Sequence, residues 1–116
     1  MAKILLIEDS RDVADMLTLL LKLKSHEVET ALSTREAKEK IEISSFALII
    51  IDVLLGSESG KDLCKEIRSM DKQVPIILMS ANPSLLKHYN DCGANAIIEK
   101  PFNIKQITDQ VNKLIN

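Results

Sequence analysis

Four apolar segments of this sequence are each followed within two residues by side chains that could take part in chemistry. The segments span 4–7, 47–51, 75–79 and 96–98, and the polar residues that follow them are Glu8, Asp9, Asp52, Ser80 and Lys100. Three carboxylates close together repel one another, and a hard divalent cation such as Mg²⁺ would relieve that repulsion. Beside such a cation a carboxylate can attack phosphorus, while an ammonium and a hydroxyl stabilise the charge on the transferred phosphoryl oxygens.

Short β-branched runs alternate with segments of helical spacing along the whole chain. The runs at 4–7, 28–30, 47–51, 75–79 and 96–98 predict strands, and the apolar spacing predicts helices around 13–21, 37–41, 63–70, 85–89 and 104–114. Ser33 and Glu36 have the spacing of a capping box at the start of the second helix. Gly93 is placed to end the fourth helix.

Five strand–helix pairs in succession predict an α/β fold, with a doubly wound, five-stranded parallel sheet between two layers of helices. The economical strand order is 2-1-3-4-5, which gives a flavodoxin-like three-layer α/β/α architecture. The runs at 47–51 and 75–79 are apolar at nearly every position, as central strands should be, whereas 28–30 is more polar and suits an edge. Ligands of such sheets bind outside the carboxyl ends of the strands, so the polar residues above should gather at one edge.

The composition indicates one folded domain over 1–116 and argues against several functions. Of the 116 residues, 46% are hydrophobic, 28% are charged and only 3% are aromatic, which indicates a globular domain with an aliphatic core. A net charge of −2 without a basic stripe is unlike a nucleic-acid binder. The sequence has no apolar run of the ~20 residues that a membrane span needs, and Met1-Ala2-Lys3 leads straight into an apolar run instead of a signal sequence. We therefore expect a cytoplasmic protein in which Cys64 and Cys92 are reduced thiols.

Taken together and in order, these motifs resemble the receiver domain of two-component response regulators, the CheY-like family. The resemblance rests on Glu8-Asp9, on Ile49-Ile50-Ile51-Asp52 with Gly60 eight residues later, on Met79-Ser80-Ala81, and on Gly93-Ala94 followed by Lys100-Pro101-Phe102. It covers essentially the whole chain. Each motif alone is unspecific, and their occurrence in this order is what makes the resemblance strong.

The resemblance implies that Asp52 takes a phosphoryl group from the phosphohistidine of a histidine kinase or a phosphotransfer protein. Asp9 and Asp52 would hold Mg²⁺ directly, the backbone carbonyl of Leu54 would be the third protein ligand, and Glu8 would act mostly through water. Such a domain is a switch in a phosphorelay and is not an enzyme acting on other substrates. It catalyses only its own phosphorylation and dephosphorylation.

The resemblance also implies how the switch operates. Lys100 would pair with the phosphoryl oxygens, presented by a cis peptide bond to Pro101. Ser80 would swing to the phosphoryl group and draw the loop after the fourth strand inward, so that a local change of charge biases a movable element. Ile97, with the polar Asn95 and Glu99 around it, leads us to expect that the fourth helix, fifth strand and fifth helix form the face that meets a downstream protein. We expect no contact with nucleic acid or membrane through this domain.

Two positions depart from the family pattern. Ile97, three residues before the lysine, stands where the family usually has a switch-linked aromatic residue, so the usual aromatic rotamer cannot carry the signal. Gly56 stands where the family often has proline, and we expect the loop 56–60 to be looser as a result.

Three other functions agree with parts of the pattern. Residues 56–62 resemble a P-loop, but the glycine spacing is one residue short and Asp62 stands where Ser or Thr should bind Mg²⁺. A phosphatase of the haloacid dehalogenase type typically has a second acid where this chain has Leu54, and it needs a larger chain with a cap. A phosphorylation-independent interaction module that keeps only the fold stays open as an alternative, because Ile97 replaces the aromatic residue. Mg²⁺-dependent phosphate uptake that Asp52→Asn abolishes would discriminate between this module and a receiver.

Overall fold

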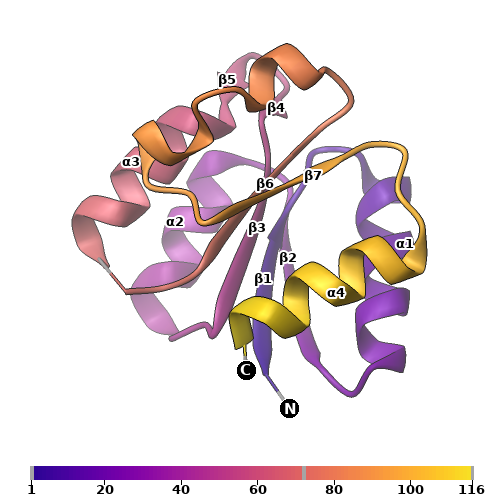
Figure 1. Ribbon diagram of the computed structural model, residues 1–116. Coiled ribbons are helices and arrows are strands. Elements are labelled where there is room, and N and C mark those ends of the chain that lie inside the picture. Colours follow the sequence, from indigo (N-terminus) through magenta and orange to yellow (C-terminus); the bar gives the residue numbers. More distant parts are fainter. Residues whose placement is uncertain (1, 72, 116) are drawn as a thin grey trace.

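Five parallel strands form a twisted sheet in the order β2-β1-β3-β6-β7 (Figure 1). Their bounds are β1 (Lys3–Ile7), β2 (Glu27–Ala31), β3 (Leu48–Asp52), β6 (Ile76–Ser80) and β7 (Ala96–Glu99). Because β6 and β7 are the fourth and fifth strands of this sheet along the chain, the predicted order 2-1-3-4-5 is confirmed. The computed structural model describes residues 2–71 and 73–115, so Met1 and Asn116, the two ends of the predicted domain, lie outside the described residues.

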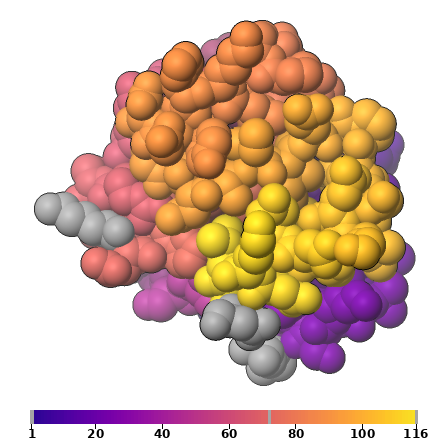
Figure 2. Space-filling model, viewed as in Figure 1, coloured from indigo at the N-terminus to yellow at the C-terminus, as the bar shows by residue number. Residues whose placement is uncertain are grey.

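Helices cover both faces of this sheet, as predicted (Figure 1). Their bounds are α1 (Arg11–Leu23), α2 (Thr34–Ile43), α3 (Gly60–Met70) and α4 (Ile104–Ile115). Because side chains alternate along a strand, Ile4 and Leu6 of β1 pack with α1 and α4, whereas Leu5 and Ile7 pack with α2 and α3. Figure 2 shows α4, in yellow, covering the sheet on the near face.

Burial along the strands follows the predicted division into centre and edge. All five residues of β3 and all five of β6 are buried, whereas β2 is partly exposed along most of its length. A central parallel strand is covered by helices on both faces, which explains its continuous apolar run. Within residues 2–71 and 73–115, the helices are too short or too polar to cross a membrane.

The prediction of a regular fourth helix was wrong, because this segment forms two short 3₁₀ turns. These are η1 (Pro83–Leu86) and η2 (Tyr89–Cys92). Between them Lys87 is extended, with φ −63° and ψ 146°, and His88 is left-handed, with φ 55° and ψ 31°. Gly93 follows η2 with φ 95°, so its predicted place at the end of the segment is confirmed.

The spacing of the buried side chains and a contact from α3 explain this break. Tyr89 and Cys92, three residues apart within η2, both pack against the core, a spacing that matches the roughly three residues per turn of a 3₁₀ helix. Lys61 at the start of α3 donates from Nζ to the carbonyl of Lys87 at 3.2 Å. That carbonyl is therefore bound from outside, where a continuous α-helix would use it internally.

The end of η2 is fastened to α3. Arg68 donates to the carbonyl of Gly93 from Nε at 3.1 Å and from Nη2 at 2.8 Å, and Nη2 also donates to Asn95 Oδ1 at 3.1 Å. Cys64 Sγ donates to the carbonyl of Cys92 at 3.3 Å. Both cysteines are free and buried, which confirms the expected thiols, and burial raises the pKa of Cys64 to about 12. A thiol with so high a pKa stays protonated and is a poor nucleophile.

The start of α2 confirms one half of the predicted capping box. Ser33 Oγ accepts a hydrogen bond from the Glu36 N–H at 3.1 Å, as the spacing predicted. The Glu36 carboxylate accepts from the N–H of Leu32 at 3.4 Å, one residue further back than the motif requires. The cap therefore holds the chain that enters α2 as well as the first turn of the helix.

The loop after β3 is a small antiparallel hairpin, and the expectation that it is looser than in related domains stays a prediction. β4 (Leu54–Leu55) pairs with β5 (Glu58–Ser59). Gly56 lies at the turn with φ 62°, a conformation that residues with side chains rarely adopt. Glu58 accepts a hydrogen bond from Thr34 Oγ1 at 2.6 Å, which joins the hairpin to the start of α2.

Gly60 begins α3 in contact with the backbone of Asp52, and we expect its replacement by alanine to destabilise the domain. A Cβ atom at Gly60 would lie 2.1 Å from the carbonyl oxygen of Asp52 and 2.8 Å from Cα of Val53. Backbone atoms cannot turn aside as a flexible side chain can, so Gly60→Ala should lower the free energy of unfolding by about 2–3 kcal/mol. Urea denaturation measures this change.

The matched control is Ser57→Ala, at an exposed position of the same hairpin. Its free energy of unfolding should stay within about 0.5 kcal/mol of the wild-type value. If both variants unfold at the same urea concentration as the wild type, the close contact at Gly60 carries no energetic weight.

Candidate functional site

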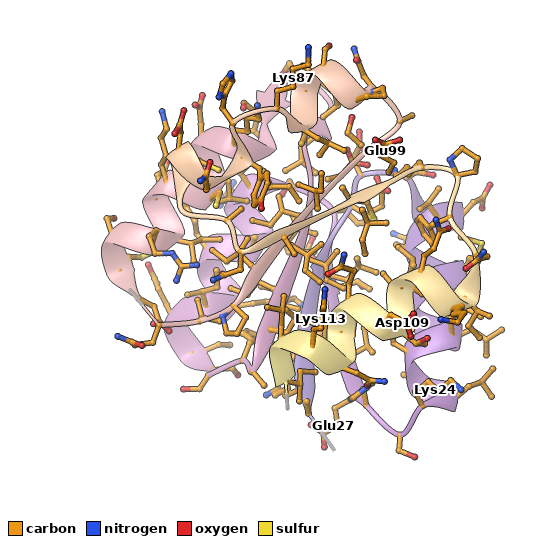
Figure 3. All side chains as sticks on the ribbon, viewed as in Figure 1. Lys24, Glu27, Lys87, Glu99, Asp109 and Lys113 are labelled. Atoms are coloured by element: carbon orange, nitrogen blue, oxygen red, sulfur yellow. The ribbon has the colours of Figure 1, made fainter. Side chains whose placement is uncertain are left out.

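The carboxyl ends of the parallel strands meet at one edge of the sheet and bring the predicted polar residues there. Glu8 follows β1, Asp52 ends β3, Ser80 ends β6, and Lys100 follows β7. The sheet pairing places Ser80 beside Glu99, and Figure 3 labels Glu99 at this edge. Residues that lie up to 92 positions apart in the sequence are therefore neighbours in space.

The ammonium group of Lys100 joins two buried carboxylates. Lys100 Nζ lies 2.5 Å from Asp52 Oδ2 and 2.7 Å from Glu8 Oε1. Glu8 is 1% exposed and Asp52 is 6% exposed, so both carboxylates are largely withdrawn from water. Buried carboxylates need such a partner, because the interior solvates charge poorly.

This environment raises the pKa values of Glu8 and Lys100. Burial, together with the nearby Asp52 carboxylate, raises the pKa of Glu8 to about 7, against the opposing effect of the hydrogen bond from Lys100. Burial lowers the pKa of Lys100, but the hydrogen bonds to Asp52 and Glu8 outweigh it and hold that pKa above its ordinary value. Near neutral pH, Glu8 can therefore exchange a proton while Lys100 stays charged.

The second oxygen of Asp52 is held by the backbone that follows. Asp52 Oδ1 accepts a hydrogen bond from the N–H of Leu54 at 2.9 Å. The Leu54 side chain is 57% exposed, and its backbone amide is the group that contacts the carboxylate. Both oxygens of the predicted nucleophile thus have a fixed donor.

Asp9 lies at the same edge but has a different partner. Its Oδ2 accepts a hydrogen bond from the N–H of Gly56 at 2.9 Å. Asp9 is exposed, in contrast to Glu8 beside it. The sequence predicted Asp9 as a metal ligand but not the amide that holds it, because the two residues are 47 positions apart and belong to different elements.

The three carboxylates do not surround one point in this structure. Over residues 2–71 and 73–115, His, Cys, Asp and Glu side chains form no group of three that could hold a metal ion. Mg²⁺ was expected to relieve the repulsion between the carboxylates, and here Lys100 relieves it for Glu8 and Asp52. The predicted ligands are nevertheless all oxygens, from Asp9, Asp52 and the carbonyl of Leu54. That set suits a hard cation which keeps several waters.

Ser80 is buried at the edge of the site with its hydroxyl turned toward its own loop. Ser80 Oγ accepts a hydrogen bond from the N–H of Asn82 at 3.0 Å. Its carbonyl accepts from the N–H of Lys100 at 2.9 Å, which fixes the backbone of the two residues side by side. The peptide bond from Lys100 to Pro101 is cis, as predicted.

Comparison with curated proteins agrees with this arrangement. The family described as "Response regulator receiver domain" matches residues 4–112. The chain is 29% identical over 117 aligned residues to a transcriptional regulatory protein, the CpxR homolog of Haemophilus influenzae, with 99% of this chain and 51% of that protein covered. It is also 29% identical to the response regulator ArlR of Staphylococcus aureus, with 99% and 53% covered. The chain thus spans about half the length of these relatives.

Solved structures lead to the same family. The chemotaxis protein CheY4 of Vibrio cholerae has a TM-score of 0.91 and 30% identity, with 98% of both chains covered. The response regulator TrrA of Thermotoga maritima, solved in complex with Mg²⁺-BeF, has a TM-score of 0.91 and 28% identity, with 98% of this chain and 99% of that one covered. The strand order, the acidic edge with its lysine and the match over nearly the whole chain agree, and the chain belongs to the response regulator receiver domain family.

Proposed function

We propose that this domain is a phosphorylation switch in which Asp52 accepts a phosphoryl group from the phosphohistidine of a histidine kinase or a phosphotransfer protein. The observation that carries the proposal is the contact of Lys100 with Asp52 and Glu8 at the carboxyl edge of the sheet. That contact places a fixed positive charge against Asp52, a buried aspartate at the end of a central strand. A carboxylate so placed can act as a nucleophile, and the ammonium can receive the charge that arrives with phosphate.

In the proposed step, an oxygen of Asp52 attacks phosphorus and forms an O–P bond. The N–P bond of the phosphohistidine breaks, and its electron pair returns to the imidazole nitrogen. Lys100 donates to a phosphoryl oxygen from its place beside Asp52 Oδ2, while the N–H of Leu54 keeps the carboxylate oriented through Oδ1. Hydrolysis of the acyl phosphate by water returns Asp52 to its first state, so the domain turns over only its own phosphoryl group.

Asp9, Asp52 and the carbonyl of Leu54 would hold Mg²⁺, with Glu8 acting mostly through water. When bound, Mg²⁺ would neutralise charge on the phosphoryl oxygens. The oxygen-only donor set supports this assignment, as does the neighbouring structure of TrrA in complex with Mg²⁺-BeF. The positive charge of Lys100 meanwhile balances the negative charge of the buried carboxylates Glu8 and Asp52.

We infer that Ser80 links phosphorylation to the surface. Its hydroxyl would leave the Asn82 amide and donate to the phosphoryl group, and the loop before η1 would follow it inward. Ile97 packs against the same core as Leu85 and Tyr89, so aliphatic packing takes the place of an aromatic rotamer in passing on this movement.

The proposed output face combines η1, η2, β7 and α4. A hollow of about 670 Å³ lies between β7 and α4 and is lined by Glu99, Asp109 and Lys113 among others. Figure 3 shows these three labelled side chains on the same side of the molecule. We infer that a downstream protein, with no nucleic acid or membrane involved, docks over this mixed-charge surface.

The test of the function is uptake of phosphate from a small acyl phosphate. Intact mass should rise by one phosphoryl group in the presence of Mg²⁺, and Asp52→Asn should abolish the gain completely, because the amide is not a nucleophile. Asp62→Asn, at an exposed position of α3, is the matched control and should label like the wild type. A wild-type protein that takes up no phosphate from any donor would point to the phosphorylation-independent module.

The output face has its own test in the same sample. Amide chemical shifts of residues 80–110 should move when the protein binds a phosphate analogue with Mg²⁺. If the changes stay confined to residues around Asp52, the proposed route through Ser80 and Ile97 is refuted, whereas the phosphoacceptor role stands.

A further inference from the structure

We propose that Gly56 is a positioning residue for the proposed metal ligand Asp9, and that it acts through its backbone N–H. The inference rests on the proposed function, since it concerns how the chain prepares a carboxylate for Mg²⁺. The N–H of Gly56 donates to Asp9 Oδ2 at 2.9 Å. This bond leaves Oδ1 of Asp9 as the oxygen that can face a cation.

The direction of this N–H is set by the hairpin. Leu54 pairs with Ser59 and Leu55 with Glu58, so the two ends of the turn are held in register. Gly56 takes φ 62° in that turn. The hydrogen bond from Thr34 to Glu58 then fastens the hairpin to the start of α2. The amide that reaches Asp9 is therefore part of a structure anchored on two sides.

The same hairpin also holds the nucleophile. The N–H of Leu54 donates to Asp52 Oδ1 at 2.9 Å, and the N–H of Gly56, two residues further on, donates to Asp9. Amides two residues apart in an extended segment point to the same side. One short segment thus fixes both carboxylates that would share the cation, and it sets their separation.

Hydrogen bonds of this kind matter for metal affinity. A carboxylate that is already oriented loses less rotational freedom when a cation binds, and loss of such a partner typically weakens metal binding ~10–100-fold. Asp9 gains most from such a bond because it is exposed and has no burial to fix its rotamer. Gly56 therefore contributes to metal binding through its amide alone, since it has no side chain.

The sharpest test removes that single N–H. The native Cys64 allows ligation of a synthetic 1–63 thioester to a recombinant 64–116 fragment, which gives the full chain. In the synthetic part, glycolic acid replaces Gly56, so that an ester oxygen stands where the amide was. Titration calorimetry of the unphosphorylated protein with MgCl₂ should show a Kd raised about tenfold or more. The same ester at Ser57, the neighbouring turn position, is the matched control and should bind Mg²⁺ like the wild type.

A second measurement does not depend on the ester folding. Hydrogen exchange of the Gly56 amide, followed by NMR, should become about tenfold faster in Asp9→Ala than in the wild type, because its acceptor is gone. The Leu54 amide, which donates to Asp52, should exchange at an unchanged rate. An unchanged rate at Gly56 would overturn the inference.

The outcomes separate this inference from the proposed function. If the wild type binds Mg²⁺, Asp9→Ala weakens that binding and the Gly56 ester does not, Gly56 has no positioning role and the phosphoacceptor proposal stands. If the wild type binds no Mg²⁺, both proposals fall. If the Gly56 ester binds Mg²⁺ more weakly than the wild type and the Ser57 ester binds it equally well, the result supports both the positioning role and the proposed function.

Discussion

Replacing Lys100 by methionine should lower the free energy of unfolding by about 3 kcal/mol near pH 8 in metal-free buffer. Methionine fills a similar volume and removes the charge, so Glu8 and Asp52 would be left buried without a partner. Breaking a buried ion pair on one side typically costs ~3–5 kcal/mol, and the lower end applies because Lys100 is partly exposed. Urea denaturation measures the loss.

The same substitution should slow phosphorylation strongly. Lys100 touches Asp52 directly and is the proposed donor to the incoming phosphoryl oxygens. Removal of one such fixed donor typically reduces a rate ~10²–10³-fold, and we expect a loss of that size in the rate of labelling by an acyl phosphate. Time-resolved intact mass spectrometry gives the rate.

Lys105→Met provides a matched control for both measurements. Lys105 also pairs with an aspartate, Asp109 on α4, but that pair is exposed to water. We therefore expect stability and labelling close to those of the wild type. If Lys100→Met were as stable and as readily labelled as Lys105→Met, the central contact of the proposed site would have no function.

The titration of Glu8 should destabilise the metal-free protein by ~2.5 kcal/mol as the pH rises from 5 to 8. The pKa of Glu8 is raised from 4.5 to about 7 in the folded protein. Between these two values the folded state holds a proton that the unfolded state has released. The free energy of unfolding therefore falls as the pH rises from 4.5 through 7 and levels off above that range.

The variant that isolates this effect is Glu8→Gln, which cannot titrate. Its stability should change far less between pH 5 and 8 than that of the wild type. Lys100 does not contribute in this window, because its raised pKa keeps it charged throughout. Thermal or urea unfolding at several pH values provides the data, and wild-type stability that rises toward pH 8 would contradict the prediction.

Sequence reasoning predicted the framework well, because the framework depends on burial. The continuous apolar runs of β3 and β6 and the polar edge of β2 appear directly in the sequence, and they determine the strand order. Once that order is known, the carboxyl ends of the strands must meet, so Glu8, Asp52 and Lys100 could be placed together in advance.

The remaining features depend on contacts that periodicity does not report. The bond between Gly56 and Asp9 joins residues 47 positions apart, and neither residue type demands the other. Side-chain geometry places Lys100 between Glu8 and Asp52. The sequence alone does not show whether three carboxylates share a metal cation or two of them share the lysine ammonium group. In the segment of η1 and η2, the few apolar residues fit a repeat of 3.0 residues per turn as well as one of 3.6. The hydrogen bond from Lys61 of α3 to the Lys87 carbonyl favours the broken helix, and the sequence does not reveal that bond.

The break at Lys87 and His88 has a mechanical consequence. A continuous helix moves as a rod, because its hydrogen bonds connect every turn to the next. Here the segment is divided into η1 and η2, and hydrogen bonds from Arg68 and Cys64 hold the end of η2 against α3. In the proposed switch, a movement that begins at Ser80 would displace η1 and would be taken up by rotation about the backbone torsions of Lys87 and His88. On the proposed route, η1 would therefore move more than η2, which is bonded to α3.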